Sequence, residues 1–257
     1  MLIDTHCHLD FPPFVDHLEQ YLTAAYAAGV RRWIVPGVHP DAWKLIVRLC
    51  EQFDGLYPAF GIHPRHAAEV SDRHLIVLEE LALQGVAIGE TGLDRHCGNL
   101  LLQEELFRRQ IRIAVSCKLP LLIHCRDMTG RTLEILHDEQ AGQVGGLMHA
   151  YSGSVESARE FIGLGFAISI GGTLKRRNAV RLPQLARELP LSCLVMETDA
   201  PDTGPHAEQS ARNWPVMLSG IAGELARIRG ITVDEVVLET GRTALRVIPK
   251  LGADSCR

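Results

Sequence analysis

Several features that would place a chain in a specialised class are absent from this sequence. None of its seven cysteines belongs to a C-x-x-C pair. Because seven is an odd number, we expect free cysteines in a reducing compartment. Its apolar runs are far shorter than the roughly 20 residues that a membrane-spanning helix needs. No basic stretch followed by an apolar stretch stands at the start, so we expect no signal peptide. These absences together predict a cytoplasmic protein.

An excess of positive charge is also missing. The chain has 26 Lys and Arg against 31 Asp and Glu, which gives a formal net charge of -5 at pH 7. Proteins that coat nucleic acid are strongly basic, so any contact of this chain with nucleic acid must be local. With 257 residues, 46% of them hydrophobic and 22% charged, the composition is that of an ordinary globular protein. This length allows one large domain or two modest ones.

Short apolar runs alternate with longer amphipathic stretches along the whole chain, and this pattern predicts alternating strands and helices. Helical spacing of apolar residues is clear in Leu75 to Leu83, Gln103 to Cys117 and Val216 to Ile228. The eight predicted strands are Leu2-Ile3, Trp33 to Val35, Tyr57 to Ile62, Val86 to Ile88, Leu121 to Ile123, Gly146 to Met148, Phe166 to Ile170 and Leu194 to Met196.

Eight strands that alternate with helices over about 250 residues are typical of a (β/α)8 TIM-type barrel. An open, doubly wound sheet is the alternative. We favour the barrel because the repeat continues to the C-terminus without a linker, and because no G-x-G-x-x-G or P-loop motif follows the first strand. The prediction is therefore an α/β protein with a single barrel domain over residues 1–257.

Imidazole and carboxylate side chains gather where the predicted strands end. The C-terminal ends of barrel strands meet at one rim, where functional groups are found. After the first strand, the two-residue period of an extended chain puts His6 and His8 on one face. A lone histidine at a strand end is more often a hydrogen-bonded structural group, but several at one rim favour a metal centre. The other candidates follow strands four, five, six and eight: Glu90, His124, His149 and Asp199.

Four imidazoles and two carboxylates suit divalent ions such as zinc, manganese or magnesium. A catalytic zinc ion usually has three protein ligands, so two ions fit six ligands better than one. A carboxylate that bridges ions about 3.5–4 Å apart would help activate a water between them for attack on a phosphoryl or carbonyl centre. Two such ions would add about +4 at the rim, which the formal net charge does not count. The sequence therefore predicts a metal-dependent hydrolase.

Seven motifs occur in order along nearly the whole chain: Asp4-Thr5-His6-Cys7-His8, Gly61-Ile62-His63-Pro64, Ile88-Gly89-Glu90-Thr91-Gly92-Leu93-Asp94, His124-Cys125-Arg126, His149-Ala150-Tyr151-Ser152-Gly153, Glu197-Thr198-Asp199-Ala200-Pro201 and Arg212-Asn213-Trp214-Pro215. Together they resemble the TatD family of metal-dependent deoxyribonucleases. The resemblance implies an amidohydrolase-like barrel that acts on nucleic acid, with single-stranded or frayed DNA as the expected substrate and exonuclease-type cleavage.

The resemblance also implies roles for the six candidate ligands. It puts His6 and His8 on the first metal, makes Glu90 the bridge, and puts His124 and His149 on the second metal. Asp199 is expected on the first metal, where it holds or deprotonates the attacking water. One family feature is missing, because the last helix of the family usually carries T-x-x-N-A where this chain has Thr240-Gly241-Arg242-Thr243-Ala244. We therefore expect Thr243 to alter or remove a supporting contact.

Two further side chains near the predicted rim have a functional and a structural interpretation. His63 is expected to contact phosphate or substrate, and the alternative is that it caps the turn at Pro64. Arg126 lies two residues beyond His124 and would share its face, where it could bind a phosphate. The alternative for Arg126 is an ion pair with Asp127 or Glu197.

Basic residues follow the seventh strand, in the region where barrels often hold phosphate. We expect Lys175 and Arg176, with Arg177 and Arg181, to contact a nucleic-acid backbone, and the alternative is a solvated surface.

Glu197 and His39 are the remaining residues for which the sequence predicts a place. Glu197 shares a face with Asp199 and is expected to be buried behind the metals, where it supports ligands without binding metal itself. Val38-His39-Pro40 repeats the pattern of Ile62-His63-Pro64, and we expect His39 on the surface or in a turn.

Three functions fit these residues. The first is a two-metal phosphodiesterase that uses a metal-bridged water to cleave DNA. The second is a metal-dependent hydrolase of amide, ester or lactone bonds on the same barrel, and related ligand sets serve both reactions. The third is a barrel retained as a binding module, which the presence of all six ligand positions argues against.

Overall fold

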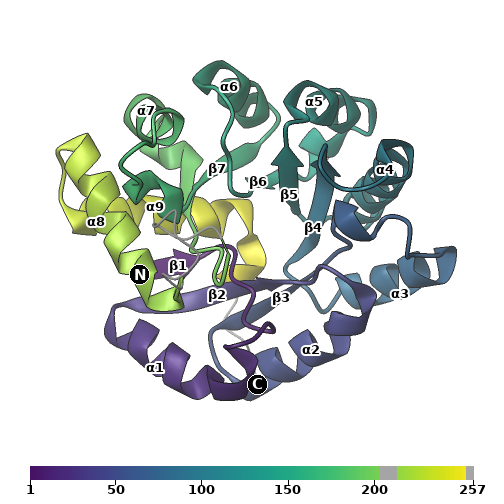
Figure 1. Ribbon diagram of the computed structural model, residues 1–257, viewed down its shortest axis with the longest axis horizontal. Helices are drawn as coiled ribbons and strands as arrows, with labels where there is room; N and C mark the ends of the chain where they lie inside the picture. Colours follow the sequence, from purple (N-terminus) through teal and green to yellow (C-terminus); the bar gives the residue numbers. More distant parts are fainter. Residues whose placement is uncertain (203–212, 253–257) are drawn as a thin grey trace.

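Eight parallel strands form the centre of the computed structural model, which describes residues 1–202 and 213–252. Strands that are neighbours in the sequence are also neighbours in the sheet, and helices surround them (Figure 1). The strands are β1 (Leu2–Asp4), β2 (Val30–Pro36), β3 (Leu56–Phe60), β4 (Ala87–Asp94), β5 (Leu121–Arg126), β6 (Gly146–Met148), β7 (Phe166–Ile170) and β8 (Leu194–Met196).

The helices alternate with the strands, and two of them follow β8. They are α1 (Leu18–Ala27), α2 (Trp43–Gln52), α3 (Asp72–Ala82), α4 (Leu100–Cys117), α5 (Thr129–Asp138), α6 (Val155–Gly163), α7 (Arg181–Glu188), α8 (Leu218–Arg229) and α9 (Val233–Val247). Short 3-10 helices stand in the connections: η1 (Val15–His17), η2 (Pro40–Ala42), η3 (Pro64–His66), η4 (Ala141–Gln143), η5 (Gly172–Lys175), η6 (Leu191–Cys193), η7 (Pro215–Met217) and η8 (Pro249–Leu251).

The first and last strands meet just beyond the end of β1. The backbone N–H of Thr5 donates to the Met196 carbonyl at 3.0 Å, and the N–H of Asp199 donates to the His6 carbonyl at 2.9 Å. These bonds join β1 to β8 and close the sheet. The (β/α)8 barrel predicted from the alternation of strands and helices is thus confirmed. Because all described strands belong to one sheet, we infer one barrel domain for the chain.

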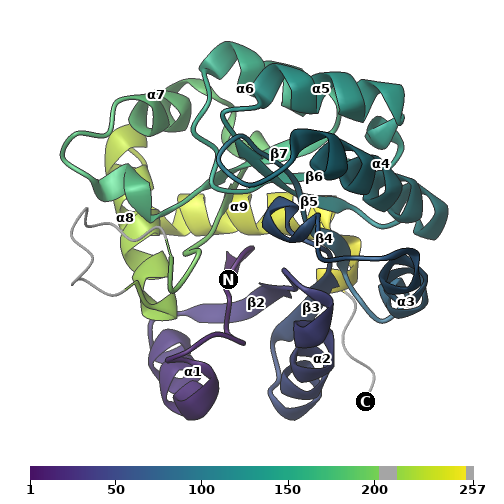
Figure 2. The same cartoon turned by 45° about the vertical axis from the view of Figure 1, so that its right-hand side comes forward.

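The barrel interior is filled by one apolar layer. Each strand supplies a side chain to this layer, which is why the strands appear in the sequence as short apolar runs. Ala244 and Val247 of α9 pack against the layer, and Figures 1 and 2 show α9 lying behind the strands. The helix therefore closes one end of the barrel. The layer consists of Ile3, Ile34, Ala59, Ala87, Leu122, Leu147, Ala167 and Val195.

Strands β4 and β5 extend well beyond their predicted ends at Ile88 and Ile123. The two strands pair in register from Thr91–Ile123 to Asp94–Arg126, with Gly92 opposite His124. A Cβ atom at Gly92 would overlap the His124 carbonyl, so only glycine permits this close approach at its φ of +144°. Glu90 and His124 consequently lie within strands and not in the loops that follow them.

Strand β3 ends at Phe60, two residues earlier than predicted. The side chain of Gln110 in α4 takes the place of a neighbouring strand at Ile62. Its Oε1 accepts from the Ile62 N–H at 2.8 Å, and its Nε2 donates to the Ile62 carbonyl at 3.0 Å. Strand β2 begins at Val30, earlier than the predicted Trp33, because Val30 already pairs with Leu2 of β1.

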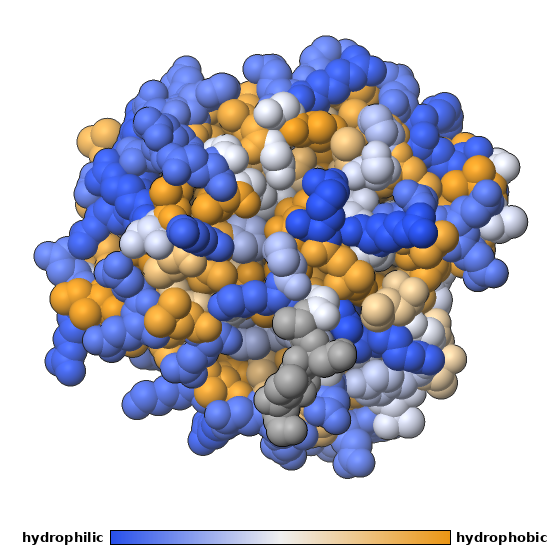
Figure 3. All heavy atoms as spheres, turned by 180° about the vertical axis from the view of Figure 1, so that it is seen from behind, coloured by the Kyte–Doolittle hydropathy of each residue, from blue (hydrophilic) through white to orange (hydrophobic). Residues whose placement is uncertain are grey.

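The helices, the surface and the cysteines bear on the features that are absent from the sequence. Within the described residues no helix combines the length and the hydrophobicity that a membrane crossing requires. Hydrophilic and hydrophobic side chains are interspersed on the face opposite the view of Figure 1 (Figure 3). The six cysteines of the described part of the chain are free. Arg212 of the last sequence motif and Cys256 lie outside the described residues.

Candidate metal centre

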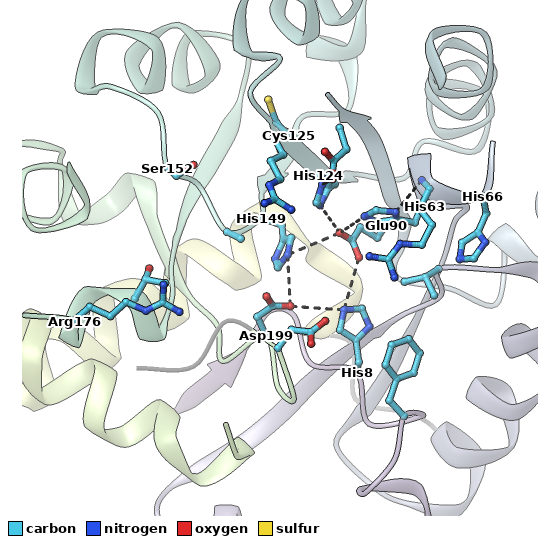
Figure 4. A pocket seen from close by; sticks show the side chains of 18 residues that line it. His8, His63, His66, Glu90, His124, Cys125, His149, Ser152, Arg176 and Asp199 are labelled. Carbon is cyan, nitrogen blue, oxygen red and sulfur yellow. Dashed lines mark hydrogen bonds and ion pairs between the residues drawn. The ribbon is translucent and has the colours of Figure 1, made fainter. Parts of the chain in front are cut away.

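The six ligand candidates of the sequence come together at the C-terminal ends of the strands. Figure 4 shows five of them: His8, Glu90, His124, His149 and Asp199. His6 and His8 follow β1, His149 follows β6 and Asp199 follows β8, whereas Glu90 lies in β4 and His124 in β5. Five of the six side chains are buried, and His124 is partly buried. Side chains from five strands therefore meet in one polar cluster, although they are far apart in the sequence.

Glu90 lies at the centre of this cluster. Its Oε2 is 3.3 Å from His6 Nε2 and 3.7 Å from His8 Nε2. Its Oε1 is 2.9 Å from His124 Nδ1 and 3.9 Å from His149 Nε2. The two carboxylate oxygens therefore face different histidines, which is the arrangement that a bridging carboxylate needs.

Asp199 lies on the other side of the same histidines. Its Oδ1 is 3.6 Å from His8 Nε2 and 3.6 Å from His149 Nε2. The residue has a φ of +56°, a left-handed conformation that residues other than glycine rarely adopt. Such strain persists where the surrounding structure fixes the backbone, and it is common at functional sites. The backbone hydrogen bond from Asp199 to the His6 carbonyl supplies part of this restraint.

Asp4 fixes the strand ends that carry His6 and Asp199. Its Oδ1 accepts from the backbone N–H of Thr198 at 2.9 Å, and its Oδ2 accepts from the Thr198 hydroxyl at 2.6 Å. Complete burial raises the pKa of Asp4 to about 8, although the bonds from Thr198 oppose the shift. The sequence reasoning missed this role, even though Asp4 opens the first motif.

The histidine rings of the cluster lie close to one another. His149 stacks on His6 with 3.5 Å between the ring centroids, and His124 lies 4.3 Å from His63. The centroids of His124 and His149, which the family resemblance puts on one metal, are 6.3 Å apart. Potential ligand atoms group in three overlapping sets: His6 with His149 and Asp199; His6 with His8 and Glu90; and His63 with Glu90 and His124.

The carboxylates make the site favourable for positive charge. Burial alone would raise the pKa of Glu90, but the imidazoles around it, His63 and His6 foremost, hold that pKa well below its ordinary value. Burial alone would lower the pKa of His149, but Glu197 and Asp199 outweigh it and raise the pKa to about 10. A buried set of imidazole nitrogens and ionised carboxylate oxygens is the donor set that divalent cations prefer.

Two further carboxylates each lie within hydrogen-bond distance of a ring nitrogen of a cluster histidine. Glu197 is buried, as expected, and its Oε2 lies 3.1 Å from His149 Nδ1. Asp94 Oδ2 lies 3.2 Å from His124 Nε2. In metal sites such carboxylates fix the orientation and tautomer of the ligand histidine. Asp94 was not among the sequence candidates, although it ends the motif that contains Glu90.

His63 caps the turn at Pro64 and also faces the cluster. Its Nδ1 accepts from the backbone N–H of Arg65 at 3.1 Å and so caps η3. Its Nε2 lies 3.6 Å from Glu90 Oε1. Burial lowers the pKa of His63 to about 3, so the ring is neutral at pH 7. Because Nδ1 accepts a hydrogen bond, the proton is on Nε2, which faces the site as a donor.

The basic residues predicted to contact substrate lie in different surroundings. Arg126 and Arg176 line a cavity of about 620 Å³ above the cluster, together with Arg65, which the sequence reasoning did not include. Of the two alternative partners of Arg126, Glu197 faces His149, whereas Asp127 pairs with His96 and its pKa is lowered by the bond to His96 and also by the charge of Arg126.

Lys175 is not among the residues that line this cavity, and its ammonium group lies against Gly220 of α8. Its contact with a nucleic-acid backbone stays a prediction.

Thr243 occupies the place of the family asparagine in α9. It is buried, and its hydroxyl donates to the Glu239 carbonyl one turn earlier at 2.9 Å. The side chain therefore satisfies its hydrogen bond within its own helix.

The comparison with known proteins decides the family. The family model for TatD related DNase matches residues 3–248 of this chain. The chain belongs to the TatD family. Among TatD-family relatives, the uncharacterized metal-dependent hydrolase YabD of Bacillus subtilis is 36% identical over 251 residues, which are 96% of this chain and 98% of YabD.

Two other TatD relatives extend the comparison. The human deoxyribonuclease TATDN3 is 32% identical over 267 residues, and the match covers 97% of this chain and 95% of TATDN3. The crystal structure of YjjV from Escherichia coli, a TatD homolog, has a TM-score of 0.91 at 32% identity and covers 96% of this chain and 98% of YjjV. The protein is thus a metal-dependent hydrolase of the TatD family.

Proposed function

We propose that the protein is a two-metal phosphodiesterase that hydrolyses DNA from a strand end. The position of Glu90 carries this proposal, because its two oxygens face His6 and His8 on one side and His124 on the other. Glu90 with His6 and His8 would hold one ion, and Glu90 with His124 the other. His149 and Asp199 would complete the set. When bound, the ions would supply Lewis-acid stabilisation of the phosphoryl oxygens and activate water.

Asp199 is the proposed general base. Its carboxylate faces the cavity beside His8 and His149, and the backbone around it is fixed by the bond to the His6 carbonyl. It would orient the attacking water and accept a proton from it. General bases of this kind contribute about 10²- to 10⁴-fold to the rate.

His63 and the arginines of the cavity are the proposed phosphate contacts. The neutral His63 ring presents its Nε2–H to the site, which suits a hydrogen bond to a phosphate oxygen that carries partial charge. Arg126 and Arg176 line the same cavity and would bind phosphates further along the chain. Glu197 and Asp94 would keep His149 and His124 in the orientation that ligation needs.

The shape of the site supports a strand end as substrate. A cavity of about 620 Å³ is of the size that holds a small ligand, and Glu90 at its base is buried. A duplex does not fit into such a space, whereas a single-stranded or frayed end does. The human relative TATDN3, a deoxyribonuclease by name, supports the same class of substrate.

One assay tests the proposal against its main rival. Chelator-treated protein is reconstituted with single divalent ions and offered single-stranded DNA with either end blocked, together with a panel of small esters, lactones and amides. We expect metal-dependent DNA cleavage that depends on a free end. Cleavage of the esters or amides without any action on DNA would overturn the proposal in favour of a different hydrolase on the same barrel.

A further inference from the structure

A second group of metal-ligating side chains lies beside the centre and takes no part in it. His39 follows β2 and caps η2, His66 lies in η3 after β3, and Glu69 follows η3. One potential ligand atom from each lies within 4.8 Å of the others. Strands β2 and β3 supply none of the six ligand candidates around Glu90, so their ends carry a histidine cluster of their own.

The geometry around Glu69 resembles that around Glu90. Glu69 Oε1 lies 3.1 Å from His66 Nδ1, and Oε2 lies 3.7 Å from His39 Nε2. The two imidazole rings are 4.8 Å apart, with an angle of 61° between their planes. One carboxylate therefore faces two imidazoles that point toward the same space, as a three-ligand site requires.

His39 and His63 differ in the side chain that stands two residues after each of them: Asp41 after His39 and Arg65 after His63. His63 Nδ1 accepts from the Arg65 N–H, and the cation of Arg65 cannot accept a proton from the ring. His39 Nδ1 accepts from the Asp41 N–H at 3.3 Å and also lies 3.4 Å from the Asp41 carboxylate. Metal binding at Nε2 requires the tautomer with its proton on Nδ1, and the Asp41 carboxylate would accept that Nδ1–H. Carboxylate, histidine and metal commonly follow one another in this order.

We propose that His39, His66 and Glu69 bind one divalent transition-metal ion of the zinc class. Two imidazoles and a carboxylate are the donors that such an ion prefers, and a water would take the fourth position. The side chains of His39, His66 and Glu69 are 24%, 22% and 56% exposed, so an ion can reach them from solvent. The site does not depend on the proposed DNA cleavage.

The position of this ion would link it to the cavity. His66 and Val38 line the cavity edge, and Figure 4 shows His66 beside His63, apart from Asp199 and His149. The ion would therefore join the connections after β2 and β3 and add positive charge at the mouth through which an anionic substrate enters.

Zinc content tests the proposal without reference to activity. Wild type, His39→Ala/His66→Ala and the control His17→Ala/His137→Ala are equilibrated with buffered zinc, and bound zinc per chain is measured by mass spectrometry. The control removes two exposed histidines that belong to neither cluster. We expect the first variant to hold one equivalent less than wild type and the control to match wild type. The difference is informative whatever number of ions the centre around Glu90 holds.

A second variant distinguishes loss of zinc binding from loss of folding. Glu69→Gln keeps the shape of the side chain and removes its charge, and we expect it to raise the zinc dissociation constant of this site roughly tenfold or more. Cobalt absorption gives an independent readout, because the band of this site should disappear in His39→Ala/His66→Ala. Equal zinc content and equal cobalt spectra in all these proteins would show an ion-pair cluster only and overturn the proposal.

Discussion

Replacing Glu197 by glutamine tests the proposed centre at a residue that touches neither substrate nor metal. The Glu197 side chain is 1% exposed. Its Oε1 accepts from the Ala150 N–H at 2.7 Å, its Oε2 lies 3.1 Å from His149 Nδ1, and the Ser169 hydroxyl also bonds to the carboxylate. Glutamine has the same shape but only one oxygen. If that oxygen keeps the Ala150 bond, the amide NH2 faces Nδ1 of His149.

The consequence for His149 is a change of tautomer. An NH2 donor beside Nδ1 favours the ring with its lone pair on Nδ1 and its proton on Nε2. Nε2 is the atom that faces Glu90 and Asp199, and a protonated nitrogen cannot bind a metal ion. Loss of an outer partner of a ligand histidine lowers metal affinity or activity about 10- to 100-fold. This range corresponds to about 1.4–2.8 kcal/mol.

The assay compares metal affinity with turnover. Apo protein is titrated with zinc or manganese by calorimetry, and turnover is followed with a chromogenic phosphodiester. Glu160→Gln, an exposed change on α6, is the matched control. We expect both quantities to fall in Glu197→Gln and neither in the control, with circular dichroism unchanged. Wild-type metal affinity and rate in a folded Glu197→Gln protein would refute the reasoning.

Three further predictions concern other parts of the chain. Asp199→Asn should reduce turnover by about 10²- to 10⁴-fold in a steady-state assay, and full activity would remove it as the base. Arg126→Gln should flatten the slope of log affinity against log salt for single-stranded DNA by about 0.7, whereas Lys175→Gln, whose side chain turns toward α8, should leave the slope unchanged unless Lys175 makes the predicted backbone contact. Glu139→Gln should lower the free energy of unfolding by about 1 kcal/mol at pH 7, because Arg112 and Arg108 hold the pKa of Glu139 below its ordinary 4.5. The stability from Glu139 is present above that value and is lost as the pH falls through the lowered pKa, so urea unfolding curves of variant and wild type should converge in acid; a constant gap would contradict this sign.

The barrel itself could be predicted from local patterns. Strands buried on both faces need apolar side chains throughout, so Phe166 to Ile170 and Leu194 to Met196 are found at the predicted positions. Strand ends were harder to predict. The extension of β4 and β5 depends on a close approach at Gly92, and the early end of β3 depends on the side chain of Gln110. Both are contacts between distant parts of the chain.

For the site, local patterns predict which residue types are available and at which rim they lie. The two-residue period of a strand and the order of strands in a barrel suffice to name the six ligand candidates. How these side chains face one another depends on the packing of separate strands. The stacking of His149 on His6, the support of His124 by Asp94 and the turning of Lys175 toward α8 depend on side-chain directions and distances between separate strands. No pattern along one segment encodes such distances, because each is set by the packing of the whole barrel.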